Sequence, residues 1–356
     1  MIHTVELTNK ISEKKAIKIL TKHNDPNEIL ELIIELKKKK ATIKLPLSIP
    51  GIILCSITYI SNKYYRIYLR VDLQSLIIGR RTIDLFECSI SFVEALRAAL
   101  DGATSKISRT LPQSDEWHVS RIDFTVNLTS DYVEECVALA KKGNDPYRYK
   151  DIIDKSGSSY RKSKSVILNF YDKFDHISKK VTMDSFDAHL LEEATNVYRI
   201  EVQCLSSNKL RSIRERYNLP KNSNLFDYLR SDIAEWACLS YYEKVIGKGD
   251  YYSLAEALEK IDSTGWTIRR KNNIKNFLKL IAQAKGMTNA KKQFLEGKKL
   301  ALTQTVVKGS RNTFRTYVKA CEEIGVNPVT IPKDWGIYYI PNPINSLDTS
   351  KITEIK

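Results

Sequence analysis

Three polar residues stand two apart in the segment VILNFYDKFD at 166–175, namely Asn169, Tyr171 and Lys173. Successive side chains of a β-strand point to opposite faces, so on a strand these three would share one face of a sheet. A phenol hydroxyl can attack phosphorus to form a phosphotyrosine, and a nearby ammonium can stabilise the charge that develops. The segment therefore predicts a reaction centre around Tyr171, with Lys173 as an accessory catalytic group.

Two other segments, WHVSRIDFTVNL and VYRIEVQCL, show the same alternation and supply acids and arginines. Arg121 and Asp123 lie on the polar phase of the first segment, and Arg199 and Glu201 lie on that of the second. Two carboxylates that converge from different strands are oxygen ligands of the kind that suit Mg²⁺ or Mn²⁺. We predict that the two acids bind the metal and that the two arginines contact phosphate, because guanidinium groups bind phosphate through paired donors.

The same alternation also fits an ordinary antiparallel sheet with one face in water. Such faces usually carry Thr, Lys, Glu and Ser without a common theme, whereas here a carboxylate stands beside a cation in two segments. A second tyrosine, Tyr160 in SGSSYRKSKS, is the rival nucleophile. Its surroundings are typical of a turn that contacts substrate, and we predict DNA contacts there from Arg161, Lys162 and Lys164.

The charge of the chain is concentrated in one stretch. The formal net charge is +15, and residues 263–320 contain fourteen Lys or Arg against a single acid, Glu296. A solvated helical surface usually mixes both signs, so a block of one sign favours a polyanion, with nucleic acid as the first candidate and anionic lipid as a weaker one. We predict DNA contacts from a subset of these cations: Arg269, Arg270, Lys271 and Lys275.

The remaining composition narrows the protein class. The six cysteines are widely spaced without a CxxC motif, and the five histidines show no metal-ligand spacing, so we expect reduced buried thiols and no histidine metal site. The sequence shows no apolar run of membrane-spanning length and no signal-peptide pattern. We therefore expect a cytoplasmic protein with no membrane contact and no cofactor besides Mg²⁺ or Mn²⁺.

Hydrophobic periodicity predicts an α+β protein. Strands at 117–128, 165–174 and 197–205 with helical segments at 130–142 and near 184–195 are typical of an antiparallel ferredoxin-like or RRM-like sheet with helices on one face. Earlier segments predict strands in HTVELT and TIKLPL, helices at 12–22 and 26–40, and a hairpin turning at Asn62 and Lys63.

The composition changes from β-rich to helical near 218–226. We therefore expect a catalytic domain at 1–220, a basic helical DNA-binding region at 221–325 and an extended C-terminal tail at 326–356.

The motifs SRIDFTVNL, ILNFYDK and YRIEVQ, in this order within residues 117–205, resemble a known family. It comprises rolling-circle replication initiators without the HUH histidine pair, of the plasmid Rep-trans and filamentous-phage gene II/X types. The opening MIHTVEL also looks like the first strand of the phage-type members. The resemblance implies that Tyr171 is the nucleophile that nicks the origin and that Asp123 and Glu201 bind the metal.

The resemblance implies a metal-dependent endonuclease that cuts one origin strand in a single-stranded region. It would keep the 5′ end as a phosphotyrosine and leave a 3′ hydroxyl for a host polymerase. The chain departs from the plasmid pattern at Asn127 and Gln203, where a further acid is common. This leaves open a non-catalytic origin-binding or RRM-like protein, although an RRM sheet needs exposed aromatic rows. A conjugative relaxase would usually need histidine ligands, which are absent here. The sequence leaves open a host helicase as a partner and a homodimer as the assembly.

Overall fold

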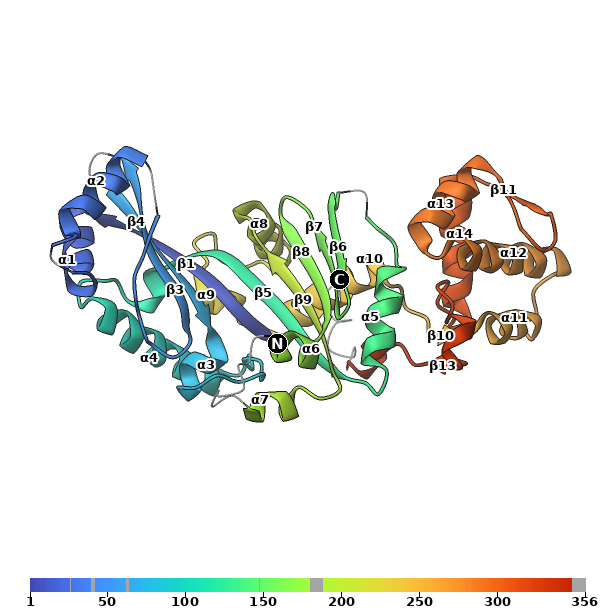
Figure 1. Ribbon diagram of the computed structural model, residues 1–356, viewed down its shortest axis with the longest axis horizontal. Coiled ribbons are helices and arrows are strands. Elements are labelled where there is room, and N and C mark those ends of the chain that lie inside the picture. Colours follow the sequence, from blue (N-terminus) through green and yellow to red (C-terminus); the bar gives the residue numbers. More distant parts are fainter. Residues whose placement is uncertain (26, 40–41, 62–63, 147, 180–187, 348–356) are drawn as a thin grey trace.

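The computed structural model describes every residue except 26, 40–41, 62–63, 147, 180–187 and 348–356 (Figure 1). Nine strands form one sheet in the order β2-β3-β4-β1-β5-β9-β8-β7-β6, and all neighbouring pairs are antiparallel. The strands are β1 (Ile2–Ser12), β2 (Thr42–Lys44), β3 (Ile52–Ser61), β4 (Tyr64–Asp72), β5 (His118–Thr129), β6 (Asp151–Lys155), β7 (Ser158–Lys162), β8 (Val166–Asp172) and β9 (Val197–Cys204).

Several helices accompany this sheet, and three of them lie close to the segments 12–22, 26–40 and 130–142, where the periodicity predicts helices. The accompanying helices are α1 (Glu13–His23), α2 (Ile29–Lys39), α3 (Leu73–Ile78), α4 (Ile90–Ile107), α5 (Val133–Lys141), α6 (Lys173–Ser178), α7 (Ala188–Glu193), α8 (Ser207–Arg216), α9 (Leu225–Tyr228) and α10 (Ser231–Val245). The expected hairpin is confirmed as β3 and β4, although its turn at residues 62–63 lies outside the described residues. Residues 184–187 of the helix expected near 184–195 also lie outside them.

A separate group of helices lies at one end of the molecule, shown in orange to red in Figure 1. It contains α11 (Leu254–Asp262), α12 (Ile268–Ala284), α13 (Met287–Glu296) and α14 (Arg311–Glu323), with two small ladders, β10 (Tyr251–Tyr252) with β13 (Tyr339–Ile340) and β11 (Lys298–Lys299) with β12 (Val306–Val307). Its core is an aromatic cluster of Phe277, Phe294, Phe314 and Tyr317, with contacting ring centroids between 5.0 and 6.0 Å apart. The helical region expected after residue 223 is therefore confirmed.

The two faces of the sheet differ as the alternation predicts. On β5, Ile122 and Phe124 are fully buried on the apolar face. Helix α10 packs against β5 and β9, and α5 packs against β7, β8 and β9. Phe170 of β8 contacts Tyr242 of α10 edge to face, with ring centroids 6.0 Å apart. The helices thus cover the apolar face, and the opposite face retains the polar side chains.

The α+β class with a large antiparallel sheet is confirmed, but nine strands are more than a ferredoxin-like or RRM-like sheet contains, so the finer expectation is not confirmed. The extra strands join because β1 pairs with both β4 and β5, which fuses the N-terminal strands to the predicted three. The other edge is extended by the β6–β7 hairpin, which the sequence pattern did not predict.

The packing also differs from the expected domain boundaries. Because α10 lies on the apolar face of β5 and β9, the core of the sheet extends past residue 220. The segment after 326 is not simply an extended tail, since β13 pairs with β10 and is flanked by two short 3-10 helices, Lys333–Trp335 before it and Pro343–Ser346 after it. Within it, buried Asn342 accepts a hydrogen bond of 2.6 Å from the Tyr242 hydroxyl.

Candidate active site

The strand register brings the predicted polar residues onto one face. On β8, Tyr171 lies directly opposite Arg199 of β9, and Asn169 lies opposite Glu201. On the other side of β9, Glu201 lies opposite Thr125 of β5. Directly opposite residues of antiparallel strands share a face, so β9 stands between β5 and β8 and its polar side chains contact both neighbours.

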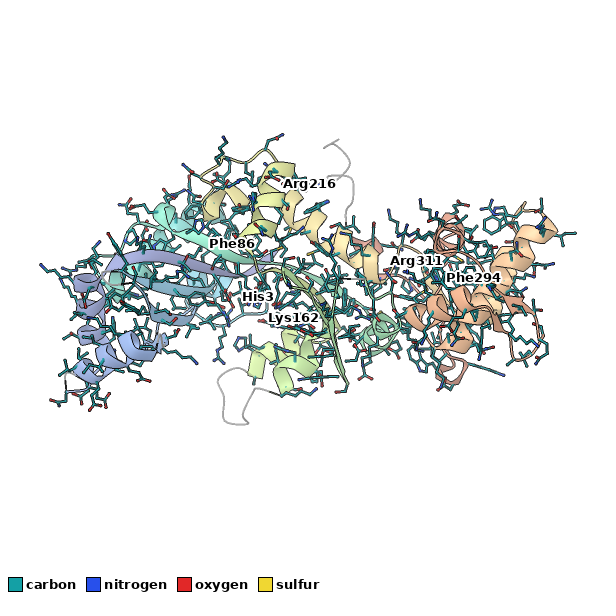
Figure 2. The ribbon with its side chains drawn as sticks, turned by 90° about the horizontal axis from the view of Figure 1, so that it is seen from above. His3, Phe86, Lys162, Arg216, Phe294 and Arg311 are labelled. Atoms are coloured by element: carbon teal, nitrogen blue, oxygen red, sulfur yellow. The ribbon has the colours of Figure 1, made fainter. Side chains whose placement is uncertain are left out.

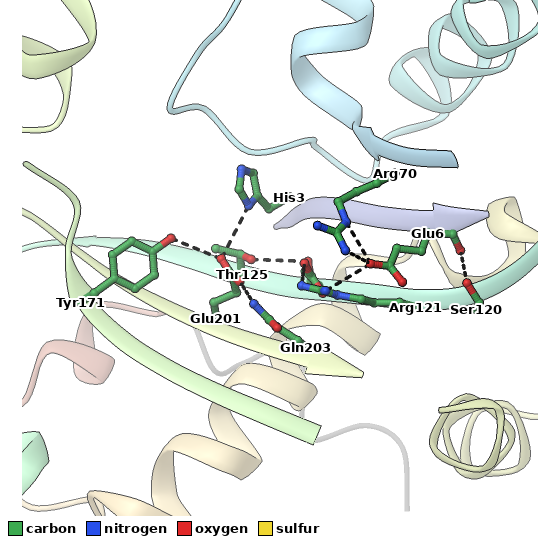
Figure 3. Close-up of polar contacts among 10 residues, drawn as sticks. His3, Glu6, Arg70, Ser120, Arg121, Thr125, Tyr171, Glu201 and Gln203 are labelled. Carbon is green, nitrogen blue, oxygen red and sulfur yellow. Dashed lines mark hydrogen bonds and ion pairs between the residues drawn. The ribbon is translucent and has the colours of Figure 1, made fainter. Parts of the chain in front are cut away.

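Tyr171 is buried at the centre of this face, with 3% of its surface exposed. Its hydroxyl donates a hydrogen bond of 3.2 Å to Glu201 Oε2 (Figure 3). The ring of His176, from α6, lies 5.0 Å from the Tyr171 ring, so one helix also covers part of the polar face. Burial raises the pKa of Tyr171 well above its ordinary value, and the Glu201 charge raises it further while Arg199 opposes the rise. A phenol with a raised pKa is a weak nucleophile unless a neighbouring group takes its proton.

Glu201 is the residue on which the polar contacts converge. It accepts hydrogen bonds from Tyr171 and from Gln203 Nε2, and His3 Nδ1 lies 3.6 Å from its Oε2 atom. Burial by itself would raise its pKa, but the contact with His3, the Gln203 hydrogen bond and the Arg199 charge together hold the pKa below the ordinary value. Glu201 is thus an ionised carboxylate in contact with the Tyr171 hydroxyl.

His3 was not among the predicted site residues, and its position depends on an irregularity in β1. The register between β1 and β5 shifts between Ile2 and Val5, where β1 accommodates one extra residue. Such a bulge re-aims a side chain, and His3 reaches the polar face, with Nδ1 near Glu201 and Nε2 3.7 Å from Asp72 Oδ2. A single histidine placed by a bulge forms no spacing motif in the sequence.

Arg121 and Asp123 form the second part of the site. Arg121 donates two hydrogen bonds to Asp123, of 2.6 Å to Oδ1 and 2.7 Å to Oδ2, and a third of 3.2 Å to Glu6 Oε1. Arg70 binds the same Glu6 oxygen at 2.7 Å (Figure 3). Burial raises the pKa of Asp123 to about 7, although the hydrogen bonds from Arg121 act to lower it. Arg121 is therefore held by two acids, and Glu6 is a member of the site that sequence reasoning missed.

Arg199 is a fully buried cation beside the candidate nucleophile. Its Nε donates a hydrogen bond of 2.6 Å to Asn127 Oδ1 and its Nη2 bonds the Ile83 carbonyl oxygen, while its Nη1 has no hydrogen-bond partner. Within the described part of the chain, no carboxylate lies within ion-pair distance of it. Burying a cation without an ionic partner is costly, and the two hydrogen bonds to Asn127 and to the Ile83 carbonyl offset part of that cost.

A pocket of about 520 Å³ opens beside Tyr171 on the polar face. Its wall comes from β6, β7, β8 and α6, and it is lined by Asp151, Ile153, Lys155, Gly157, Ser158, Tyr160, Lys162, Asn169, Tyr171, Asp175, His176 and Lys179. Both tyrosines considered as nucleophiles therefore reach one pocket, and of the two it is Tyr171 that donates a hydrogen bond to Glu201. Figure 2 labels Lys162, which lines this pocket, and His3 of β1 in the central part of the molecule.

The prediction that Lys173 shares the strand face with Tyr171 is wrong. Strand β8 ends at Asp172, and Lys173 is the first residue of α6, where its side chain is buried. The Asp172 side chain caps the helix by accepting hydrogen bonds from the backbone N–H groups of Phe174 and Asp175. This N-cap changes the periodicity from two to 3.6 residues directly after the strand, so Lys173 is not held in the row of Asn169 and Tyr171.

The prediction that Arg161 contacts DNA is also wrong, because its side chain is fully buried. The residues around it form β7, and Arg161 points to the apolar face while Tyr160 points to the pocket. Its Nε donates a hydrogen bond of 2.9 Å to Asp145 Oδ1, and its Nη2 donates one of 3.0 Å to the Ala140 carbonyl. The neighbours Lys162 and Lys164 are exposed and stay candidates for DNA contact.

We expect Arg161→Ala to lower the free energy of unfolding by about 3–5 kcal/mol, because it leaves Asp145 and buried carbonyl groups without their partner. Lys162→Ala, at the exposed neighbouring position, should change it by less than about 0.5 kcal/mol. Denaturant unfolding of both variants measures the difference. A stable Arg161→Ala protein with weakened DNA binding would restore the original assignment.

Three of the four predicted DNA contacts in the C-terminal region have partners within the chain. Arg270 forms an ion pair of 2.6 Å with Glu323, and its guanidinium lies 4.0 Å from the centre of the Trp266 ring. Lys275 pairs with Asp262, and Lys271 donates to the carbonyl oxygen of the same residue. Arg269 is exposed. The DNA contacts of these residues stay predictions.

The donor atoms around Glu201 bear on the predicted metal site. Among the described residues, no three His, Cys, Asp or Glu side chains form a group arranged to hold a metal ion. Both Asp123 oxygens are bonded to Arg121, whereas Asn169 Oδ1, opposite Glu201, is buried without a hydrogen-bond partner. Both Glu201 oxygens also accept hydrogen bonds, but from the neutral donors Tyr171 and Gln203, whereas the Arg121 cation bonded to Asp123 would repel a metal ion. With the unpaired Asn169 oxygen beside it, the Glu201 side therefore suits Mg²⁺ or Mn²⁺ better than Asp123 does.

No protein-family model, curated protein or solved structure matches this chain. In the described parts of the chain, none of the helices has the length and apolarity needed to cross a bilayer. All six cysteines are free thiols, and all but Cys88 are buried. The function is therefore inferred from the arrangement of the polar face.

Proposed function

We propose that the protein is a DNA strand-transfer enzyme that initiates rolling-circle replication, with Tyr171 as its nucleophile. The observation that carries the proposal is the hydrogen bond from the Tyr171 hydroxyl to the Glu201 carboxylate, on a strand face where Tyr171 lies opposite the buried cation of Arg199. A structural tyrosine needs one hydrogen-bond partner, whereas an attacking phenol needs a proton acceptor and a group that stabilises phosphate charge. Glu201 accepts the hydrogen bond of the phenol, and the Arg199 cation, buried opposite Tyr171, contributes a positive potential at this face.

The pocket beside Tyr171 favours a nucleic-acid substrate. Lys155, Lys162 and Lys179 line it, and their charges would attract phosphates of a chain that enters from the solvent. Asp151 and Asp175 also line the pocket, and Asp175 is paired with Lys179 at 2.5 Å. A volume of about 520 Å³ is of the size that holds small ligands rather than a duplex, so we infer that a single strand enters.

The reaction follows from this arrangement. The Tyr171 Oη atom forms a bond to the phosphorus of a DNA phosphodiester, and its proton passes to Glu201 Oε2. The bond between phosphorus and the 3′-oxygen breaks, and this oxygen takes a proton from water to become a free 3′ hydroxyl. The products are a 5′-phosphotyrosine and a primer end for a host polymerase, and the reverse transfer rejoins the strand.

Asn169 and Glu201 would hold a Mg²⁺ or Mn²⁺ ion, with phosphate and water as further ligands. The ion would polarise the phosphate and neutralise charge in the transition state. Asp123 acts through Arg121, which it holds together with Glu6 on the same face. Arg121 is thereby oriented for a second phosphate contact near the pocket.

The experiment that tests the proposal uses the wild-type chain and a labelled single-stranded oligonucleotide from the DNA that adjoins its gene, with and without Mn²⁺. A covalent protein–DNA band on a denaturing gel, mapped by peptide analysis to Tyr171, is the expected result. Nicking of supercoiled plasmid that carries the same DNA is the second readout. DNA binding without any adduct or nick would favour the non-catalytic origin-binding alternative.

A further inference from the structure

In the described C-terminal region, most cations without an ion-pair partner lie outside the start of α12. Lys299 and Lys308 of the β11–β12 hairpin, and Arg311 and Arg315 of α14, are exposed, and none of them takes part in an ion pair with another described residue. We call these four residues the basic face. Glu296 is the single acid of the surrounding stretch 263–320.

The hairpin and the helix form one continuous structure. Lys299 pairs with Val306 across the ladder, and Lys308 follows Val306 by two residues, so both lysines lie on the same side of the hairpin. The chain then enters α14 directly, where Ser310 caps the helix by accepting a hydrogen bond from the Thr313 N–H at 3.1 Å. Four cations thus lie on a hairpin and the first turns of the helix that follows it.

The helix presents its cations in a row. Arg311 and Arg315 are four residues apart, so they lie on the same side of α14, about 6 Å apart along the axis. The neighbouring side of α14, which carries Phe314, is packed in the aromatic core. Figure 2 labels Arg311 and Phe294 in this group of helices, away from Lys162 and the pocket.

We propose that the basic face binds the phosphates of duplex DNA beside the nick site, with α14 in or along the major groove. The inference rests on the proposed function and assigns the duplex to a surface distinct from the single-strand pocket. Single-strand binding needs aromatic side chains on which bases stack, and here Phe277, Phe294 and Phe314 are buried in the core. An exposed helix with cations on one side instead fits a groove about 12 Å wide.

The test compares two variants of the full chain that lose the same charge. One carries glutamine at the basic face, K299Q, K308Q, R311Q and R315Q, and the control carries K14Q, K15Q, K18Q and K44Q at exposed lysines of the N-terminal half. Binding to a short DNA duplex of arbitrary sequence is measured by fluorescence anisotropy over a salt series. Each lost phosphate contact should reduce the log–log salt slope by about 0.9, so the first variant should lose up to about 3.6 and the control almost nothing.

Adduct formation on a single-stranded oligonucleotide separates this inference from the proposed function. The basic-face variant should form the Tyr171 adduct at the wild-type rate, because the pocket is unchanged. An unchanged salt slope, an equal loss in the control, or tighter binding of the wild-type chain to an RNA duplex of the same sequence would each overturn the inference. If the wild-type chain forms no adduct yet the salt slopes differ as expected, the proposed reaction fails while the duplex surface stands.

Discussion

Tyr171→Phe is expected to abolish the covalent protein–DNA adduct while fold and DNA affinity persist. The substitution deletes one oxygen and keeps the ring that packs 5.0 Å from His176, so the packing of the site is retained. Loss of the hydrogen bond to Glu201 should lower the free energy of unfolding by about 1.5–3 kcal/mol, because the acceptor is charged. The measurement is the shifted band of a labelled single-stranded origin oligonucleotide on a denaturing gel.

Tyr160→Phe is the matched control for this prediction. Tyr160 lies opposite Asn169 on the neighbouring strand and lines the same pocket, so it offers a second phenol in nearly the same surroundings. No hydrogen bond to Glu201 is recorded for it, and we expect its loss to slow the reaction only a few-fold. An adduct mapped to Tyr160, or one that persists in Tyr171→Phe, would show that the nucleophile is assigned to the wrong residue.

The polar face could be predicted because a strand encodes its two faces in a local pattern. Alternation in three short segments places Asp123, Glu201 and Tyr171 on one side, and the register confirms that they share it. That β9 stands between β5 and β8 is not contained in any segment, since it depends on long-range pairing. The sequence thus identified the face of the sheet but not the partners of each residue on it.

The predictions for individual side chains were wrong or incomplete where the local backbone structure changes within one or two residues. Asp172 caps a helix directly after the strand, so Lys173 leaves the row predicted for it. Arg161 looked like a loop residue because Gly and Ser surround it, yet its burial depends on Asp145, sixteen residues earlier in the chain. His3 reaches Glu201 through a bulge, and a periodic pattern cannot register an inserted residue.

The two departures from the plasmid pattern have structural roles in this chain. Gln203 donates a hydrogen bond to Glu201, where an acid would repel that carboxylate and raise its pKa. Asn127 accepts a hydrogen bond from Arg199 without neutralising it, where an acid would form an ion pair. Neither amide neutralises the charge of Glu201 or Arg199, so both charges remain at the polar face, as the proposed reaction requires.

The charge of Glu201 is the feature on which the proposed proton transfer depends. A glutamine at this position keeps the size of the side chain but has no negative charge to accept the phenol proton. It also removes a carboxylate charge close to Arg199 and His3, so the stability of the variant has to be measured beside its activity. Glu94→Gln, at an exposed position of α4, is a control for the chemical change itself.

Glu201→Gln should lower the rate of adduct formation by about 100-fold or more, the usual loss when a general base is removed. Duplex affinity and its salt slope should stay at the wild-type values, because Glu201 lies on the polar face near the pocket and not on the basic face of α14 and its hairpin. Single-turnover formation of the adduct, followed with a labelled oligonucleotide at saturating protein, measures the rate. A Glu201→Gln protein that unfolds cooperatively in denaturant and still reacts within a few-fold of wild type would exclude Glu201 as the proton acceptor and leave it a structural partner of Tyr171.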